Sequence, residues 1–234
     1  MTPKRLHISA FTSTLIFSLL CLVAKPTATY AQQQKKMAVV EKDTILLFRG
    51  FSLSFDLVGA AMMAFSDRGE IEGALRVNLR DKWFPIVEIG VGRANRNDDE
   101  VTHLTYKTTA PYFRVGMDWN IMKNKHASNR LYAGFRYAFT SYKVDITRDD
   151  LPDPVWRYTS GFGATGMSCS MHWLEGVFGI DAKIYGPLHL GWSVRYKRRL
   201  VHSDGDLGGT WYVPGFGIND KDGFAANFNV IIDI

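Results

Sequence analysis

The sequence predicts an all-β protein, an eight-stranded antiparallel up-and-down transmembrane β-barrel. The first observation is a stretch of about ten residues, alternately apolar and charged, small or glycine, that recurs some eight times. Because side chains alternate across a strand, each such stretch has one apolar and one polar face. The second is an export signal before the first strand, and the third is an alternation of short and long connections.

The N-terminus has the anatomy of a secretory signal peptide. Lys4 and Arg5 form a basic start, residues 15–23 are apolar, and Thr29-Tyr30-Ala31 offers a cleavage site. The apolar run is too short for a membrane-spanning helix. We therefore expect a cleaved signal peptide at 1–31, a polar tether and lead-in at 32–50, and an outer-membrane β-barrel at 51–234.

Net charge and cysteine content argue against two further classes of protein, those that bind nucleic acid and those held together by disulfides. The full chain has a formal net charge of +5, and cleavage removes three positive charges and no acid, which leaves +2. A mature chain so close to neutral gives no reason to expect nucleic acid as a partner. Cys169 would be the only cysteine left, so a disulfide framework within the chain is excluded.

The strands are justified one by one from the alternation. The first, 51–65, begins with Phe51, Leu53 and Phe55 on one face, and the second, 70–80, places Ile71 and Leu75 opposite Glu72 and Arg76. The others are expected at 83–94, 111–122, 131–143, 171–185, 188–199 and 224–234. Each is long enough to cross a bilayer when tilted, which takes about 9–11 residues. No helical period stands out beyond the leader.

The connections predict the orientation. Residues 81–82, 123–130 and 186–187 are short, whereas 95–110, 144–170 and 200–223 are long and polar; the first connection, 66–69, is a short exception. Outer-membrane barrels have short periplasmic turns and long external loops. Both termini are then expected on the periplasmic side.

Alternation alone leaves a soluble, lipocalin-like barrel open, with the apolar face inward. Glycines beside long charged residues on the polar faces favour a narrow, filled lumen instead. Aromatic residues near the short turns, Trp83, Phe84, Trp119 and Tyr185, suit an interfacial girdle. We therefore expect the apolar faces to contact outer-membrane lipid.

Charged residues in the polar phase of the strands predict an ionic network inside the barrel. Its members are Asp56, Arg76, Glu88, Arg114, Asp118, Arg136, Glu175, Asp181, Lys183, Arg195 and Lys197, with Glu72 also on this face. Because the signs nearly balance and an unpaired buried charge is costly, the network is interpreted as structural; a proton or ion path is the alternative. Arg136 and Arg195 are expected to pair with Glu88 and Glu175.

The sequence resembles an uncharacterised outer-membrane β-barrel family of Bacteroides-type bacteria, a domain of unknown function. The resemblance rests on residues 74–82, 130–139, 173–199 and 205–217 and extends over nearly all of the mature chain. It implies the fold and the location in the outer membrane of a Gram-negative cell. It implies no catalytic residue.

No catalytic, cofactor or metal motif is found, and we expect a non-catalytic protein. The leading hypothesis is a structural or surface-interaction role, in which long external loops contact a surface polysaccharide or protein. Aromatics in these loops, Trp156, Trp211, Tyr212 and Phe216, suit recognition, although packing against the barrel rim is slightly favoured for each of them. The alternative is a lipid-modifying outer-membrane enzyme, for which His202-Ser203-Asp204 is the nearest candidate group.

Overall fold

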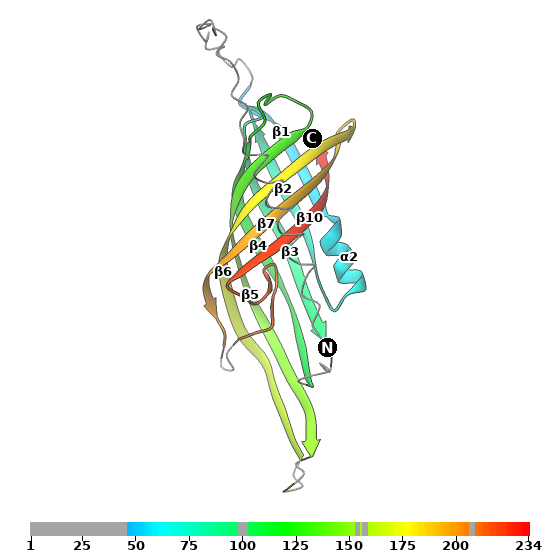
Figure 1. The fold of residues 1–234 in the computed structure, drawn as a ribbon, viewed down its shortest axis with the longest axis vertical. Coiled ribbons are helices and arrows are strands. Elements are labelled where there is room, and N and C mark those ends of the chain that lie inside the picture. The colour runs from blue at the N-terminus through cyan, green and yellow to red at the C-terminus, as the bar shows by residue number, and fades with distance from the viewer. Residues whose placement is uncertain (1–45, 98–102, 153–154, 156–158, 206–208) are drawn as a thin grey trace, which may run out of the picture. The chain divides into compact units, whose positions relative to one another are not determined.

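Eight antiparallel strands are hydrogen-bonded into a closed ring in the computed structural model (Figure 1). The structure describes residues 46–97, 103–152, 155, 159–205 and 209–234. The signal peptide predicted at 1–31 and nearly all of the 32–50 tether lie outside them. The order around the ring is β1-β10-β7-β6-β5-β4-β3-β2, so each ring strand pairs with the ring strands before and after it in sequence, and β1 pairs with β10. The predicted up-and-down order is confirmed.

Each ring strand overlaps one of the predicted strands, although several bounds differ. The elements are β1 (Phe48–Asp56), α2 (Leu57–Phe65), β2 (Arg68–Leu79), β3 (Trp83–Arg96), β4 (Leu104–Asn120), β5 (Arg130–Pro152), β6 (Thr159–Tyr185), β7 (Leu188–Ser203), β8 (Tyr212–Val213), β9 (Gly217–Ile218) and β10 (Asp222–Asp233). Two-stranded β8-β9 is separate from the ring.

The prediction of a strand over residues 57–65, the second half of the first predicted strand, is wrong, because these residues form helix α2. Asp56 caps the helix: its carboxylate accepts hydrogen bonds from the backbone N–H groups of Val58 and Gly59. Residues 57–65 are apolar without interruption and rich in alanine and methionine, which favour helices. A continuous apolar run carries no period that separates a helix from a strand, so the alternation rule failed here.

Two of the three long polar connections, 95–110 and 144–170, are also largely strand. β3 and β4 stay paired as far as Arg96 and Tyr106, and β5 and β6 stay paired as far as Pro152 and Thr159. The β5–β6 hairpin therefore extends well beyond the other strands (Figure 1). Threonine, tyrosine and valine are frequent in these segments, and their preference for strands outweighed the polarity that predicted loops.

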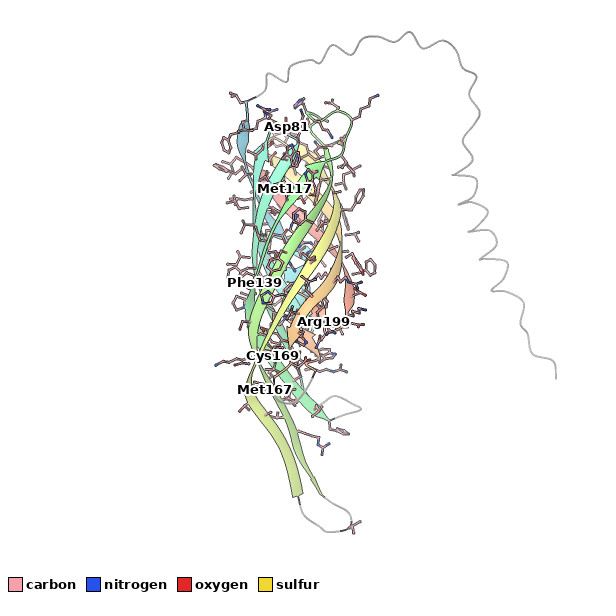
Figure 2. The ribbon with its side chains drawn as sticks, turned by 90° about the vertical axis from the view of Figure 1, so that its left-hand side faces the viewer. Asp81, Met117, Phe139, Met167, Cys169 and Arg199 are labelled. Atoms are coloured by element: carbon pink, nitrogen blue, oxygen red, sulfur yellow. The ribbon has the colours of Figure 1, made fainter. Side chains whose placement is uncertain are left out.

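Asp81 organises the tight turn between β2 and β3. Arg80 and Asp81 both have positive φ, and the Lys82 N–H donates to the Leu79 carbonyl at 3.1 Å, as in a type I′ hairpin. The turn therefore lies one residue earlier than predicted. The Asp81 carboxylate pairs with Arg49 and with His126 Nδ1 at 2.7 Å. Figure 2 shows Asp81 at one end of the ring and Cys169 toward the other.

The Asp81 contacts predict a loss of stability in acid. Burial alone would raise the pKa of Asp81, but hydrogen bonds from His126 and Asn78 and the charge of Arg49 outweigh it and lower the pKa. A carboxylate with a lowered pKa stabilises the fold above its unfolded pKa, and this contribution disappears as the pH falls through the folded value. Between about pH 5 and about pH 3, the free energy of unfolding should therefore fall less steeply in Asp81→Asn than in the wild type. The exposed Asp220→Asn is the control; an equal slope in Asp81→Asn and the wild type would contradict the assignment.

The two faces of the ring differ sharply in polarity. Exposed large apolar side chains lie on the outside of all eight strands, for example Leu53, Leu75, Ile89, Val115, Phe135, Phe178, Val194 and Ile232. We call this set the apolar belt. The alternate positions point inward and bury charged and polar groups, as the alternating burial along β3 shows.

Candidate functional site

The interior of the ring holds a dense ionic cluster. Five of its members are carboxylates, Glu72, Glu88, Asp118, Glu175 and Asp181, and five are cations, Arg76, Arg114, Arg136, Arg195 and Lys197. β2, β3, β4, β5, β6 and β7 all contribute to it. Every member is buried, and the signs balance, as a water-poor interior requires.

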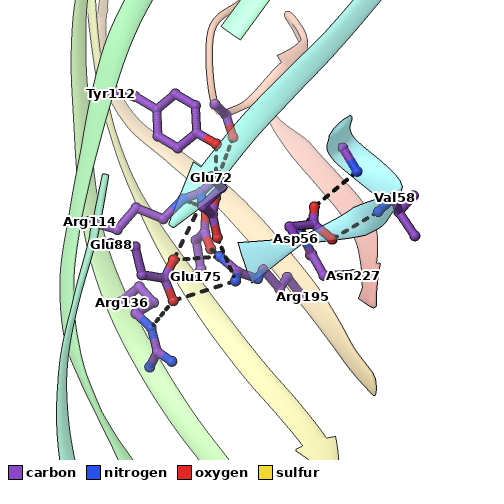
Figure 3. A network of polar contacts seen from close by, with 12 residues as sticks. Asp56, Val58, Glu72, Glu88, Tyr112, Arg114, Arg136, Glu175, Arg195 and Asn227 are labelled. Atoms are coloured by element: carbon purple, nitrogen blue, oxygen red, sulfur yellow. Dashed lines mark hydrogen bonds and ion pairs between the residues drawn. The ribbon is translucent and has the colours of Figure 1, made fainter. Parts of the chain in front are cut away.

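Glu88 lies at the centre of the cluster (Figure 3). Its carboxylate accepts from Arg136 Nε at 3.0 Å and from Arg195 Nη1 at 2.7 Å, with Arg114 Nη1 at 3.4 Å. Glu72 pairs with Arg195 Nη2 at 3.0 Å and with Arg114. Three guanidinium groups thus share two glutamates, and each of these glutamates has at least two cationic partners.

Glu175 extends the cluster toward β6. Its carboxylate lies 2.9 Å from Arg114 Nε and 3.4 Å from Arg195 Nη1, and it accepts from Trp173 Nε1 at 2.7 Å. Arg195 therefore contacts both expected glutamates. Arg136 contacts only Glu88, although Arg136 and Glu175 are directly opposite in the β5–β6 ladder. Its guanidinium turns instead toward Asp118, at 2.7 Å and 2.9 Å.

A second layer of pairs lies toward the turn end. Arg76 Nη1 donates to Asp181 at 2.6 Å, and Arg76 Nη2 lies 3.3 Å from Asp118. The Arg76 guanidinium also lies 4.8 Å from the centre of the Tyr132 ring, within the range of a cation–π contact. Asp118 joins the two layers, because it contacts both Arg76 and Arg136.

Two predicted members lie outside the cluster. Lys183 is exposed beside the β6–β7 turn, opposite His189 in the ladder, so it is not buried with the cluster. Asp56 is buried but serves as the cap of α2 and accepts from Asn227 Nδ2 at 2.8 Å. Among the predicted girdle aromatics, Phe84 is also wrongly placed, because it faces inward beneath the Arg130 guanidinium.

Glycines make room for the cluster. A Cβ on Gly134 would collide with the Asp118 carboxylate and the Met117 carbonyl, and one on Gly191 would lie 2.8 Å from Asp181 Oδ1. At Gly116 a Cβ would collide with the Phe135 carbonyl, which belongs to the backbone and has little freedom to move. The alternation of glycine and charge in the sequence therefore has a steric origin: long charged side chains occupy the space that a neighbouring Cβ would fill.

This packing predicts contrasting effects of two similar substitutions. Gly116→Ala should lower the free energy of unfolding by about 1–3 kcal/mol, the usual range for overpacking. Gly176→Ala in β6, two strands away in the ring, is the matched control, because a Cβ there would meet nothing within 4 Å. Urea titration of both variants in detergent measures the difference; an equal effect at the two glycines would contradict the steric explanation.

The sequence pattern did not predict the segment that closes the interior. This segment lies on the side of the cluster that is away from the Asp81 turn. Residues 210–218, the plug segment, contain the β8–β9 hairpin and turn back through Gly215, which has φ +82°. Arg114 Nη2 and Lys197 Nζ each donate to the Gly215 carbonyl at 2.7 Å. At its other end Tyr106 donates to the Tyr212 carbonyl at 2.7 Å. The cluster's own cations therefore anchor the plug.

The aromatics of the plug segment pack inward. Tyr212 and Phe216 are buried, and Phe216 meets Trp173 edge-to-face at 5.7 Å. Trp211 is half-buried against Tyr106. The burial of Tyr212 and Phe216 agrees with the packing alternative rather than with recognition, and Trp156 lies outside the described residues. One signal was present: residues 209–218 carry no charge within a long polar connection, which favours burial.

The family model described as Domain of unknown function (DUF6048) matches residues 11–233. The chain belongs to this family. A search of curated proteins and a search of solved structures each found no match.

In this DUF6048 chain, the imidazole of His202 and the thiol of Cys169 both lie near Tyr142. His202 lies 2.7 Å from Asp204 through Nδ1 and 3.1 Å from the Tyr142 hydroxyl through Nε2, but that hydroxyl is buried and bonded to Thr210. Burial raises the pKa of the Cys169 thiol. Among the described residues, no group of three or more histidine, cysteine or acidic side chains is arranged to hold a metal ion, and no helix is long and apolar enough to cross a bilayer.

Proposed function

We propose that this protein is a closed, non-conducting β-barrel of the outer membrane with a structural or surface-interaction role. The apolar belt carries this proposal: large apolar side chains are exposed on all eight strands, while the ten charged groups of the ionic cluster are buried inside. A water-soluble barrel has the reverse polarity, with its apolar side chains inward. Contiguous exposed apolar surface of this extent requires an apolar partner, and a belt around the whole ring fits lipid.

Aromatics near the turn end support the same position. Trp83 and Trp119 pack edge-to-face at 5.9 Å on the outer face, and Tyr185 is exposed beside the β6–β7 turn. Such amphipathic rings favour the interface between lipid and water. With the short turns in the periplasm, the extended β5–β6 hairpin projects outward and is the segment best placed to contact a surface polysaccharide or protein.

Cell fractionation tests the membrane proposal. The exported chain should be recovered in outer-membrane vesicles, require detergent for extraction, and migrate differently on gels before and after boiling. Recovery in the soluble periplasm without detergent would overturn the proposal and favour the lipocalin-like alternative.

The two layers of the interior predict an absence of conductance. Eight strands leave room for side chains only, and here the cluster and the plug segment block the interior in series. Planar-bilayer recordings should therefore show no stable channel, either for the wild type or after residues 210–218 are replaced by a glycine-serine linker. Stable conductance in the wild type would contradict a filled lumen, and conductance in the linker variant alone would show that the cluster does not seal the ring.

A further inference from the structure

The wall of the ring is interrupted on one side. The β1–β10 ladder ends at the pair Asp56 and Asn229, where the chain turns into α2. β10 continues to Asp222 paired only with β7, and β2 continues to Arg68 paired only with β3. Between these two strand ends the wall is formed by α2, which lies on the outside of the ring (Figure 1).

Helix α2 is packed unequally on its two neighbours. A Cβ on Gly59 would collide with the Glu70 carbonyl, and one on Gly69 would collide with the Met63 backbone, so α2 lies in close contact with β2. A cavity of about 430 Å³ lies between α2, the first residues of β2, the plug segment and β10. This volume lies within the range of small-molecule sites, about 300–1,000 Å³.

One part of the cavity lining consists of apolar side chains. Val58 and Met62 of α2, Phe216 and Ile218 of the plug segment, and Phe224 and Ala226 of β10 line it. Val58, Met62, Ile218 and Phe224 are also exposed on the surface, so the apolar lining continues onto the apolar belt. An apolar chain lying in lipid would reach the cavity without crossing a polar surface.

The rest of the cavity lining contains residues of both charge signs, and it contains polar groups whose hydrogen-bonding capacity is not fully used. Asn227 is only 4% exposed; its amide donates to Asp56, which fixes the orientation, and its Oδ1 has no hydrogen-bond partner among the described residues. Lys197 is only 3% exposed and donates to the Gly215 and Phe216 carbonyls, which leaves a third ammonium hydrogen. Glu70 and Arg68 line the same cavity.

We propose that this cavity binds a single-chain zwitterionic lipid of the lysophospholipid class, which enters sideways from the membrane between α2 and β10. The acyl chain occupies the apolar lining. The phosphate pairs with Lys197 and Arg68, the ammonium with Glu70, and the glycerol hydroxyl donates to Asn227 Oδ1. A zwitterion suits this lining, because carboxylates such as Asp220 and Asp222 would repel a purely anionic lipid. The inference rests on the proposed membrane position, since the ligand is a membrane lipid.

Photo-crosslinking tests the site. The full chain, purified in detergent, is irradiated with lysophosphatidylethanolamine that carries a diazirine in its acyl chain, and labelled peptides are mapped by mass spectrometry. Label should concentrate on α2 and residues 222–228. Ala226→Trp, which fills the cavity, should reduce labelling there by about tenfold, equivalent to about 1.4 kcal/mol of binding. Ala133→Trp is the matched control on the outer face of β5 and should label like the wild type.

A second probe and a second variant test the contribution of the head group separately from that of the acyl chain. Diazirine-palmitate should label these peptides much less than the lysophospholipid, and Arg68→Gln should reduce that difference; equal labelling by both probes would overturn the head-group assignment. Uniform labelling of the belt, unchanged by Ala226→Trp, would overturn the cavity itself. Gel mobility before and after boiling verifies that each variant is folded. A chain that fractionates with membranes but is not labelled contradicts only the cavity, whereas a chain soluble without detergent contradicts the membrane proposal.

Discussion

Glu88→Leu should lower the free energy of unfolding by about 3–5 kcal/mol, the usual loss when one partner of a buried ion pair is removed. Glu88 is 1% exposed and contacts three guanidinium groups. Without it, five buried cations face four carboxylates. The leucine fills part of the space but neutralises none of the excess positive charge. Urea titration in detergent, followed by tryptophan fluorescence, measures the loss.

The double variant Glu88→Leu/Arg195→Leu should be more stable than Glu88→Leu alone. Removal of Arg195 restores four carboxylates to four cations, and apolar side chains of similar volume often replace a buried pair at little cost. Lys183→Gln is the control, because Lys183 is exposed outside the cluster and its loss should change stability by no more than about 0.5 kcal/mol. If the two single losses simply add in the double variant, the cluster is not a coupled network.

Val115→Arg should destabilise the ring by about 2–4 kcal/mol in a lipid bilayer, if Val115 faces hydrocarbon as proposed. Val115 is 52% exposed in the middle of β4, between Val87 and Tyr137 in the ladders. An arginine there would place a charge among lipid chains. Refolding into liposomes at graded urea concentrations measures the effect.

The same substitution near the end of a strand should matter much less. Val201 is 63% exposed close to the end of β7, where an arginine reaches the interface and should cost about 0–1 kcal/mol. In a water-soluble protein, both changes would lie within about 0.5 kcal/mol of the wild type. Equal, small effects at the two valines would therefore contradict a bilayer around the belt.

The strands and their two faces were predictable because they depend on local sequence. A period of two along a strand places Glu88 inward and Val87 and Ile89 outward whatever the neighbouring strand is. The charge balance and the glycines were visible in the same pattern. The identity of most ion-paired partners was not predictable in this way, because long guanidinium side chains select partners across several strands. Arg136, for example, bypasses its ladder partner Glu175 and reaches Asp118.

The sequence by itself determined the eight strands, their order and the polarity of their faces, since each follows from alternation and from connections between neighbours. Only the tertiary structure decided the helical wall and the plug. Residues 57–65 form a helix where Asp56 caps them and Gly59 and Gly69 allow close packing on β2. Residues 210–218 fold inward because Arg114 and Lys197, distant in sequence, supply donors to the Gly215 carbonyl. Both arrangements depend on contacts between distant residues, which local periodicity does not encode.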